Sequence, residues 1–160
     1  MNSSILKEPP LHPSPQLIQT LKALFSSQRL ATLATQGKGQ AYGSLVAFAA
    51  SDDLKRLLFA TTRATRKYAN LTRTPRVAMV IDNRTNQESD FHKTIAATAI
   101  GTVKEAEGKE KESFLKLYLS KHPYLKDFVT SPTCALLRLE VETYYVVSQF
   151  QNVMELHIKP

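Results

Sequence analysis

The chain has 160 residues and a net charge of +7, with 42% hydrophobic and 22% charged residues. This length is typical of one domain, and we expect residues 14–160 to form it behind an extended, proline-rich arm over residues 1–13. A single cysteine, Cys134, excludes an internal disulfide and favours a reducing compartment. No apolar run approaches the roughly 20 residues of a membrane helix. The first residues lack the layout of a secretory signal, so we expect the cytoplasm.

Apolar periodicity predicts the elements in chain order. A first helix begins at Pro15, directly after the capping residue Ser14, and ends near Ser27. We expect strands over residues 30–35, 42–50, 56–61, 77–81, 95–107 and 136–147, further helices over residues 65–74 and 109–120, and a polar loop over residues 82–92. Gly101 is expected to mark a bulge within its strand. The pattern of residues 148–160 is ambiguous.

The last of these segments shows the most regular alternation. Its apolar face is predicted to carry Leu137, Leu139, Val141, Thr143, Tyr145 and Val147. Most connections between the expected strands are too short for a crossover between parallel strands. The sequence therefore predicts a mainly β (α+β) fold, a six-stranded antiparallel split β-barrel with short flanking helices.

The basic residues are concentrated in one segment. Between Leu54 and Ile81 there are seven basic residues and no acidic one, which equals the excess of 21 Lys+Arg over 14 Asp+Glu in the whole chain. They are Lys55, Arg56, Arg63, Arg66, Lys67, Arg73 and Arg76. A local excess fits a small anionic ligand better than a nucleic acid, whose contact surface interleaves exposed aromatic residues with the cations.

Within this segment, an apolar strand end leads through hydroxyl residues to two adjacent cations. Thr61, Thr62 and Thr65 precede Arg66 and Lys67, which lie on the first turn of the expected helix. Backbone amides, hydroxyls and cations at a helix N-terminus are the groups that bind phosphate. The sequence thus favours a phosphate site here. The alternative is a solvated turn with scattered cations.

Other chemical signatures are absent from the sequence. It contains no glycine-rich nucleotide-binding loop, no Cys-x-x-Cys, no His-Glu-x-x-His and no Gly-x-Ser-x-Gly. The four histidines (His12, His92, His122 and His157) lack the spacing of metal ligands and are expected at the surface or in loops. Cys134 is interpreted as a structural thiol. No metal site is predicted.

Four segments, in this order, resemble the pyridoxamine 5′-phosphate oxidase-like family of FMN-binding split barrels. Residues 30–35 are similar to the opening strand of that family, and residues 42–48 to the second strand, which follows the flavin edge. Residues 59–67 have the same strand, hydroxyls, Arg and Lys in register. Residues 70–77 resemble the Asn-Leu and Pro-Arg-Val continuation. The resemblance covers about residues 17–104 well.

This resemblance implies FMN as the cofactor and a homodimer with the flavin at the subunit interface. The flavin ring would be lined by Ser44, Leu45 and Val46. The ribityl chain and ring edge would lie beside Ala60, Thr61 and Thr62. The phosphate would be held by Thr65, Arg66 and Lys67. The second subunit would supply Phe150 or nearby tail residues. To this set we add the polar loop residues Asn83, Arg84 and Asn86, because polar groups at a strand end point toward a bound cofactor.

Two departures from the family pattern concern the substrate. True pyridoxamine-phosphate oxidases carry an Arg-x-His element near the C-terminus, whereas Glu155 precedes His157 in the comparable stretch here. A carboxylate there would repel a phosphorylated substrate. Ala96 and Ala97 stand where those oxidases have an Arg-Gln pair. The sequence therefore predicts a flavin-binding relative that is not a true pyridoxamine-phosphate oxidase.

The leading prediction of function is an FMN-dependent oxidoreductase that acts on a small substrate, with the flavin supplying the redox chemistry. A non-catalytic module is the alternative, with flavin, haem or a deazaflavin serving a redox sensor or electron carrier. A third class is a small barrel that binds nucleic acid through the basic segment. No residue is predicted to be catalytic, and neither a nucleic acid nor a membrane is the expected partner.

Overall fold

The protein is described by a computed structural model that covers residues 14–160, so the expected arm over residues 1–13 lies outside the described residues. The strands are β1 (Leu30–Gly37), β2 (Gln40–Ala50), β3 (Arg56–Thr62), β4 (Arg76–Asp82), β5 (Ile95–Glu105), β6 (Cys134–Ser148) and β7 (Asn152–His157). The helices are α1 (Pro15–Ser27), α2 (Arg66–Arg73), α3 (Asp90–Lys93), α4 (Gly108–Lys121), α5 (Lys126–Val129) and the 3-10 turn η1 (Pro123–Leu125).

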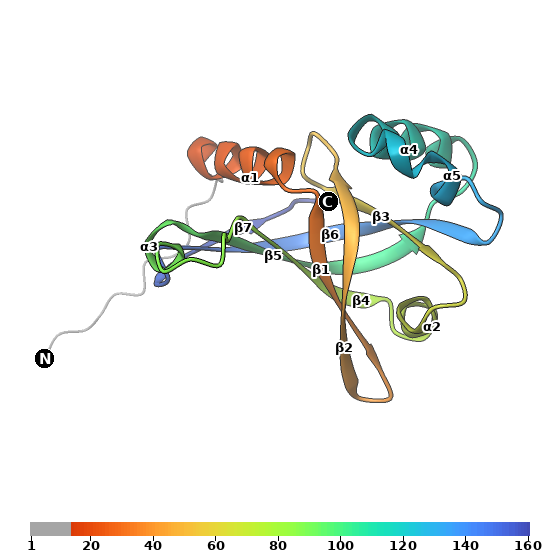
Figure 1. Cartoon of the computed structure of the whole chain (residues 1–160), viewed down its shortest axis with the longest axis horizontal. Coiled ribbons are helices and arrows are strands. Elements are labelled where there is room, and N and C mark those ends of the chain that lie inside the picture. The colour runs from red at the N-terminus through yellow and green to blue at the C-terminus, as the bar shows by residue number, and fades with distance from the viewer. Residues whose placement is uncertain (1–13) are drawn as a thin grey trace, which may run out of the picture.

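The strands form one antiparallel sheet that closes on itself (Figure 1). Their order is β3-β2-β1-β4-β5-β6-β7, and β3 also pairs with β6, which completes a six-stranded barrel. The predicted fold is therefore confirmed. Strand β7, which the sequence pattern left ambiguous, extends the sheet beyond β6. Only Leu156 of this edge strand is buried, which explains why its pattern was weak.

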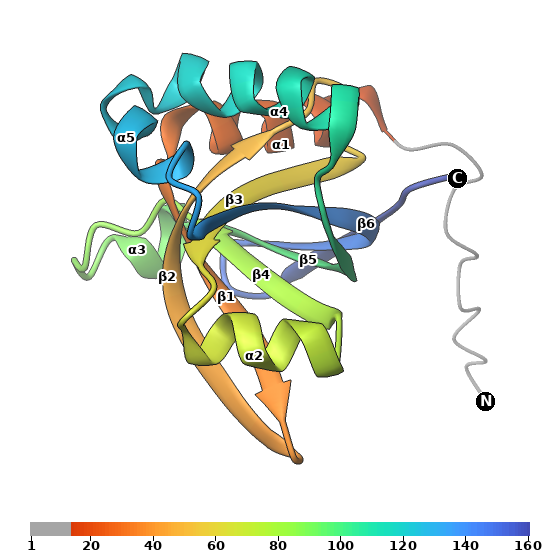
Figure 2. The ribbon, with the colours of Figure 1, turned by 90° about the vertical axis from the view of Figure 1, so that its right-hand side faces the viewer.

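The barrel interior forms the main core, and short helices close it. Leu33, Phe48, Leu57, Phe59 and Met79 point inward and are fully buried, each side chain stabilising the fold by about 2 kcal/mol. Helix α1 joins this core through its apolar stripe, and α2 joins it through a single leucine. Figure 2 shows α1 and α4 on one side of the barrel and α2 on the opposite side.

A second core lies on the outside of the barrel, beneath α4. Ala49 of β2, Leu58 of β3 and Leu136 of β6 point away from the barrel interior. They pack against Phe114 and Tyr118 of α4. Both faces of β3 are consequently buried, as expected for a strand whose sequence is apolar at nearly every position.

The regular alternation predicted for β6 is interrupted, and the prediction was wrong for its last third. Ile100 pairs with Thr143 and Gly101 with Val141, so Glu142 is an extra residue opposite this pair. The inward face changes at this bulge: Tyr144 and Val146 are fully buried, whereas Tyr145 and Val147 are half-buried. The predicted bulge at Gly101 is confirmed, although the extra residue belongs to the facing strand. A Cβ on Gly101 would lie 1.9 Å from the Glu140 carbonyl oxygen, so only glycine fits.

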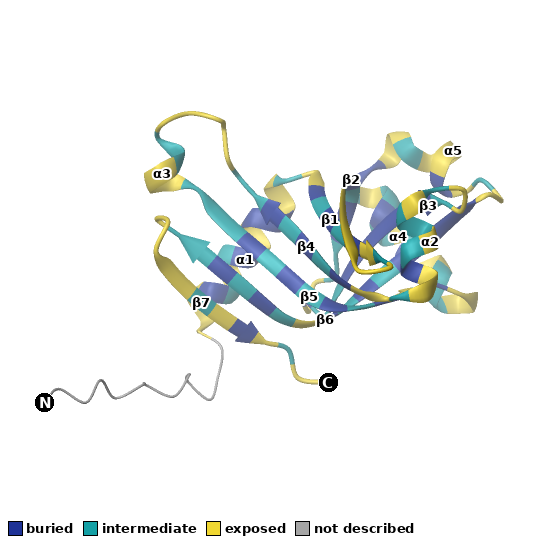
Figure 3. Cartoon of the chain, turned by 90° about the horizontal axis from the view of Figure 1, so that it is seen from below, coloured by how far each residue is buried: buried dark blue, intermediate teal, exposed yellow. Residues whose placement is uncertain are grey.

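One outer face of the sheet has no helix over it. In Figure 3, β4, β5, β6 and β7 face the viewer without a helix in front of them. One cross-strand row on this side consists of Leu45, Thr32, Val80, Thr98 and Tyr145. All five are uncharged, and each is partly or fully exposed. No helix within residues 14–160 is both long and apolar enough to cross a membrane.

Candidate functional site: a cationic corner and a distant aromatic groove

The predicted phosphate segment forms a capped turn between β3 and α2. The Thr61 side chain points into the barrel and is 2% exposed, and its hydroxyl lies 2.9 Å from the Thr65 hydroxyl. Thr65 is the N-cap of α2, where its Oγ1 accepts a hydrogen bond of 3.3 Å from the backbone amide of Tyr68. These bonds fix the first turn of α2 at the end of β3, so Arg66 and Lys67 lie at a defined helix N-terminus.

Arg66 and Lys67 carry charges that the fold does not neutralise. Neither side chain forms an ion pair with any acidic group among residues 14–160. The Arg66 guanidinium lies over the Tyr42 ring, with its central carbon 5.4 Å from the ring centroid. The first turn of α2 has no acidic residue. Because the positive end of the helix dipole adds to both charges, this cationic corner (Thr61, Thr65, Arg66, Lys67) favours an anion.

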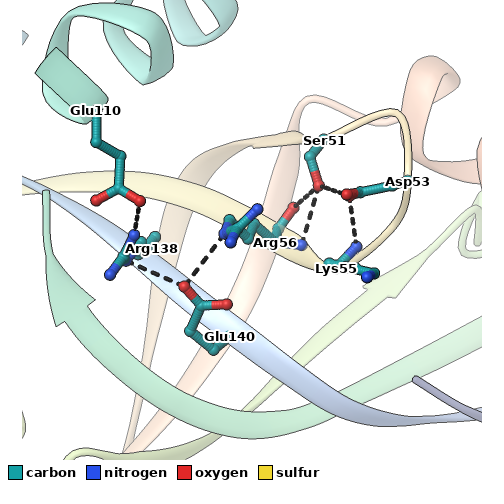
Figure 4. A network of polar contacts seen from close by, with 7 residues as sticks. All are labelled: Ser51, Asp53, Lys55, Arg56, Glu110, Arg138 and Glu140. Atoms are coloured by element: carbon teal, nitrogen blue, oxygen red, sulfur yellow. Dashed lines mark hydrogen bonds and ion pairs between the residues drawn. The ribbon is translucent and has the colours of Figure 1, made fainter. Parts of the chain in front are cut away.

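Three other residues of the basic segment are structural, which corrects the interpretation of that segment as uniformly unneutralised. Arg76 forms a two-pronged ion pair with Glu142, at 2.7 and 2.9 Å. Arg56 bonds Glu140 at 3.2 Å within the network drawn in Figure 4, where Arg138 also contacts Glu140. These carboxylates lie on β6, more than sixty residues away in sequence. Counting charges within one stretch of sequence therefore could not reveal these ion pairs.

Arg63, the third structural cation, supports the corner without belonging to it. Its guanidinium pairs with Glu105 and donates to the backbone carbonyls of Pro132 and Cys134 at 3.1 and 3.2 Å. The Tyr68 hydroxyl donates to the same carboxylate of Glu105 at 3.2 Å. Arg63 thus ties the β3–α2 turn to β5 and β6, which leaves Arg66 and Lys67 as the adjacent cations open to a ligand.

The β2 residues expected to line a flavin ring lie on two faces. Ser44 and Val46 point toward the barrel interior, and the Ser44 hydroxyl is buried without a hydrogen-bond partner among the described residues. Leu45 points outward and is 68% exposed. An unpaired buried hydroxyl costs stability unless a ligand or water pairs with it. Ser44 is therefore the β2 residue with a free polar group to offer.

The β3 residues of the predicted site are likewise divided. Thr61 points inward toward Thr65, whereas Ala60 points outward and is covered in the core beneath α4. Thr62 is half-buried, and its backbone carbonyl accepts hydrogen bonds from the Thr61 and Thr65 hydroxyls at 3.1 Å. A ligand at the corner would meet Ala60 and Thr62 mainly through their backbone.

The polar loop after β4 places its three predicted residues in different roles. Asn83 closes the loop, because its side-chain oxygen accepts a hydrogen bond of 2.8 Å from the amide of Ile95. Arg84 pairs with Asp82 at 3.2 Å. Asn86 adopts a left-handed backbone, with φ of 61°. Arg84 and Asn86 line a groove whose other wall includes Phe150.

The groove, which we call the aromatic groove, has a volume of about 780 Å³. It is lined by Asp82, Arg84, Asn86, Gln87, Glu88, Asp90, Phe91, Thr94, Ala96, Val147 and Phe150. The rings of Phe91 and Phe150 lie 5.1 Å apart at 51°. Figures 1 and 3 place α3, which carries Phe91, and α2 at opposite ends of the molecule. The structure therefore separates the predicted site residues into two groups.

His122 lies in the connection between α4 and η1, as the expectation of a surface or loop imidazole allows, but it is not at the surface. This residue is fully buried after the end of α4, and its Nε2 lies 2.8 Å from the carbonyl oxygen of Phe48. Because a carbonyl only accepts, Nε2 carries the proton and Nδ1 accepts from the Tyr124 hydroxyl at 3.3 Å. Burial lowers the pKa of His122 below its ordinary value. Sequence gave no signal, since the carbonyl partner lies 74 residues away.

Cys134 is buried, as expected of a structural thiol, and burial raises its pKa. The carboxylate of Asp90 is occupied by hydrogen bonds within its own loop, which it accepts from the amides of Thr85, Asn86 and Gln87. The bond from Thr85 is the largest of the effects that bring the pKa of Asp90 to about 2. The thiol and the carboxylate therefore both have structural roles.

The fold and the corner define a class of protein: a six-stranded antiparallel barrel in which two cations without acidic partners among residues 14–160 begin a helix at a strand end. The sequence matches the family described as Pyridoxamine 5′-phosphate oxidase over residues 17–148, and the chain belongs to that family. The match extends through β6, further than the segments that carried the sequence resemblance. No curated protein matches the sequence significantly.

Solved structures share this fold at low sequence identity. A haem-binding protein from Mycobacterium smegmatis superposes with a TM-score of 0.80 and 17% identity, over 92% of this chain and 59% of that one. The chain thus spans about three fifths of that protein. An FAD-binding protein from Mesorhizobium loti superposes with a TM-score of 0.64 and 17% identity, over 80% of this chain and 90% of that one. General Stress Protein 26 from Bacillus anthracis superposes with a TM-score of 0.67 and 19% identity, over 89% of this chain and 99% of that one. These similarities establish the fold.

Proposed function

We propose that the protein binds FMN at the cationic corner and acts as a flavin-dependent oxidoreductase on a small substrate. The observation that carries the proposal is the pair Arg66 and Lys67, which lies at a capped helix N-terminus without an acidic partner in residues 14–160. A phosphate dianion would offset both charges and the helix dipole. A planar guanidinium and a compact ammonium are complementary ligands for its oxygens.

The groups around the corner fit the rest of an FMN molecule. The unpaired hydroxyl of Ser44 offers a hydrogen bond on the inner side of β2. Thr65 is held in place by its bonds to Thr61 and to the α2 backbone, so its orientation is set before a ligand arrives. The flavin would supply hydride and electron transfer when bound. The protein would hold the phosphate, orient the ring and limit its contact with water.

A homodimer with the flavin at the subunit interface is part of the proposal. The uncharged outer row from Leu45 to Tyr145 has the composition of a surface that a second copy would cover. The two groups of site residues lie at opposite ends of one chain. A second subunit would bring its own aromatic groove, including Phe150 of the partner subunit, toward the corner. We also keep the cytoplasm as the proposed location, in line with the single, buried cysteine.

The test is an Arg66→Ala, Lys67→Ala double variant titrated with FMN and with riboflavin, which lacks the phosphate. We expect FMN affinity to fall roughly 100-fold or more, because two charge-assisted interactions are lost. Riboflavin affinity should change little, so the preference for FMN should disappear. Flavin fluorescence reports both titrations. Arg73→Ala is the matched control, since it removes an exposed cation from the other end of α2.

An undiminished yellow colour in the purified double variant would contradict the proposed phosphate site. The similarity to a haem-binding protein makes haem an alternative cofactor to test. The absorption spectrum of freshly purified protein distinguishes haem and a deazaflavin from FMN. Turnover is tested separately, by reduction of bound flavin with nicotinamide donors and reoxidation by generic acceptors. Stable binding without steady-state turnover would favour a redox sensor or electron carrier.

A further inference from the structure

The aromatic groove contains an exposed ring held by an unfavourable backbone. Gln149 and Phe150 form the turn between β6 and β7, with φ of 50° and 64°. Both are left-handed, a conformation that favours Gly, Asn and Asp in such turns and that strains other residues. The Phe150 ring gains little burial in return, because it is 63% exposed. Strain that presents an apolar ring to solvent points to a binding function rather than to stability.

The opposite wall of the groove is rigid. Asp90 accepts hydrogen bonds from three successive backbone amides of the loop and from the Thr85 hydroxyl. Phe91 follows Asp90 directly on α3, so the same carboxylate anchors the backbone that carries the Phe91 ring. That ring is 56% exposed and meets Phe150 at a centroid distance of 5.1 Å. Two loops from different parts of the chain thus present two rings to one space.

The floor of the groove suits a flat molecule. Ala96 of β5 pairs with Val147 of β6, and both side chains are small and half-buried. Beside them, the Thr94 hydroxyl is buried and has no hydrogen-bond partner among residues 14–160. A ring placed on this floor would contact apolar atoms on its face and would find one free hydroxyl at its edge.

The charges that line the groove disfavour an anion. Asp82, Glu88 and Asp90 contribute three carboxylates, against the single guanidinium of Arg84. Arg84 is already paired with Asp82. An anionic ligand would therefore meet a surplus of two negative charges, whereas a neutral or cationic ligand would not. This charge pattern is opposite to that of the cationic corner.

We infer that the aromatic groove binds a planar, conjugated substrate that carries no negative charge, with Phe91 and Phe150 contacting its ring and Thr94 its polar edge. That the bound molecule is a substrate rests on the proposed flavin-dependent function. The binding site itself does not, because every residue that forms it belongs to one chain and lies apart from the cationic corner of that same chain.

The test compares two fluorescent tricyclic probes of opposite charge: 9-aminoacridine, a cation, and 9-anthracenecarboxylate, an anion. We expect the FMN-loaded full chain to bind the cation at least roughly tenfold more tightly than the anion. Phe91→Ala and Phe150→Asn should each weaken cation binding by roughly tenfold, the value of one lost ring contact. Phe150→Asn should keep or raise the melting temperature, since asparagine tolerates the left-handed backbone.

Gln149→Asn is the matched control: it changes the other strained residue of the same turn without removing a groove side chain, and it should leave probe binding unchanged. Equal loss of binding in Gln149→Asn and Phe150→Asn would overturn the inference, as would equal affinity for both probes. Competition between the cation and FMN would also overturn it, by showing that the groove holds the flavin. The Arg66→Ala, Lys67→Ala variant should still bind the cation, which separates this site from the proposed function.

Discussion

Two pairs of adjacent basic residues occupy opposite ends of their helices. Arg66 and Lys67 begin α2, whereas Lys121 ends α4 and His122 follows it. The Lys121 ammonium donates to the carbonyl of Phe25 in the last turn of α1 at 2.7 Å and lies 3.8 Å from the centroid of the Phe48 ring. Every side-chain nitrogen of the second pair has a partner within the protein. The first pair has no acidic partner in the described part of the chain.

The difference follows from the helix dipole. A cation near a helix C-terminus is stabilised by the carbonyls there, and Lys121 also satisfies an unpaired carbonyl of α1. A cation at an N-terminus meets amide groups that repel it, so Arg66 and Lys67 weaken α2 unless an anion is present. Charge at a helix C-terminus is thus explained by folding alone. Charge at an N-terminus without acidic partners is not, and the phosphate proposed for the corner would account for it.

The largest effect should come from His122→Ala. The change leaves the Phe48 carbonyl without its donor and opens a cavity in a fully buried site. We expect the free energy of unfolding to fall by about 3 kcal/mol, as for comparable losses of a buried hydrogen bond and volume. Urea denaturation measures the loss. The FMN affinity of the folded variant should be unchanged. A loss of affinity equal to that of the Arg66→Ala, Lys67→Ala variant would contradict the different roles assigned to the two basic pairs.

A smaller effect is expected from pH. The pKa of His122 is lowered in the folded protein by burial, so below the ordinary value of about 6.5 the unfolded chain binds a proton that the folded chain does not. The stabilisation is complete above pH 7 and declines as the pH falls toward 5. Unfolding free energies of wild type and His122→Gln, measured over this range, should converge toward low pH.

Lys121→Met should destabilise the protein more modestly. Burial is the main cause that lowers the pKa of Lys121 to about 8, so the ammonium still predominates at neutral pH and keeps its bond to Phe25. Methionine preserves most of the packing against Phe48 but leaves the α1 carbonyl unpaired. We expect a loss of about 1 kcal/mol by thermal or urea unfolding. A gain in stability would show that this capping interaction is not net favourable.

The smallest effect has the opposite sign. Arg66→Gln in the flavin-free protein should raise the unfolding free energy by about 0.5 kcal/mol, because it removes a cation from the N-terminus of α2. Added inorganic phosphate should stabilise wild type more than the variant. The same substitution at Arg73, in the last turn, should slightly destabilise the helix. Equal changes at both ends would contradict the role assigned to the helix dipole.

The sequence predicted the six strands of the barrel and its antiparallel architecture, because alternation and turn residues are local signals. It failed where a partner lay far along the chain. The bulge at Glu142 changes which side chains of β6 point into the barrel beyond it. No local sequence pattern indicates which of two paired strands carries the extra residue. The burial of His122 was not predicted either, because its carbonyl partner lies on β2, 74 residues away in sequence.

For the candidate site, the sequence located the corner but overstated its extent. The hydroxyl-Arg-Lys order fixed Thr65, Arg66 and Lys67 at the start of α2, as the structure shows. It could not show that Arg63 pairs with Glu105, 42 residues away. Thr94 and Phe91 were missed as groove residues, since neither an unpaired hydroxyl nor an exposed ring is visible without coordinates.

The change of face within β6 has a practical consequence for anyone who aligns or redesigns this chain. Strict alternation through Glu142 would carry Tyr145 and Val147 inside and would turn the Tyr144 hydroxyl away from the Leu54 carbonyl that it bonds at 2.7 Å. Deleting Glu142 would instead remove the bulge and keep Tyr144 and Val146 inside. An alignment with a strand that lacks the bulge, made without a gap at Glu142, would therefore exchange interior and surface for the rest of the strand. Grafts across this barrel should treat the two halves of β6 as separate modules joined at Glu142.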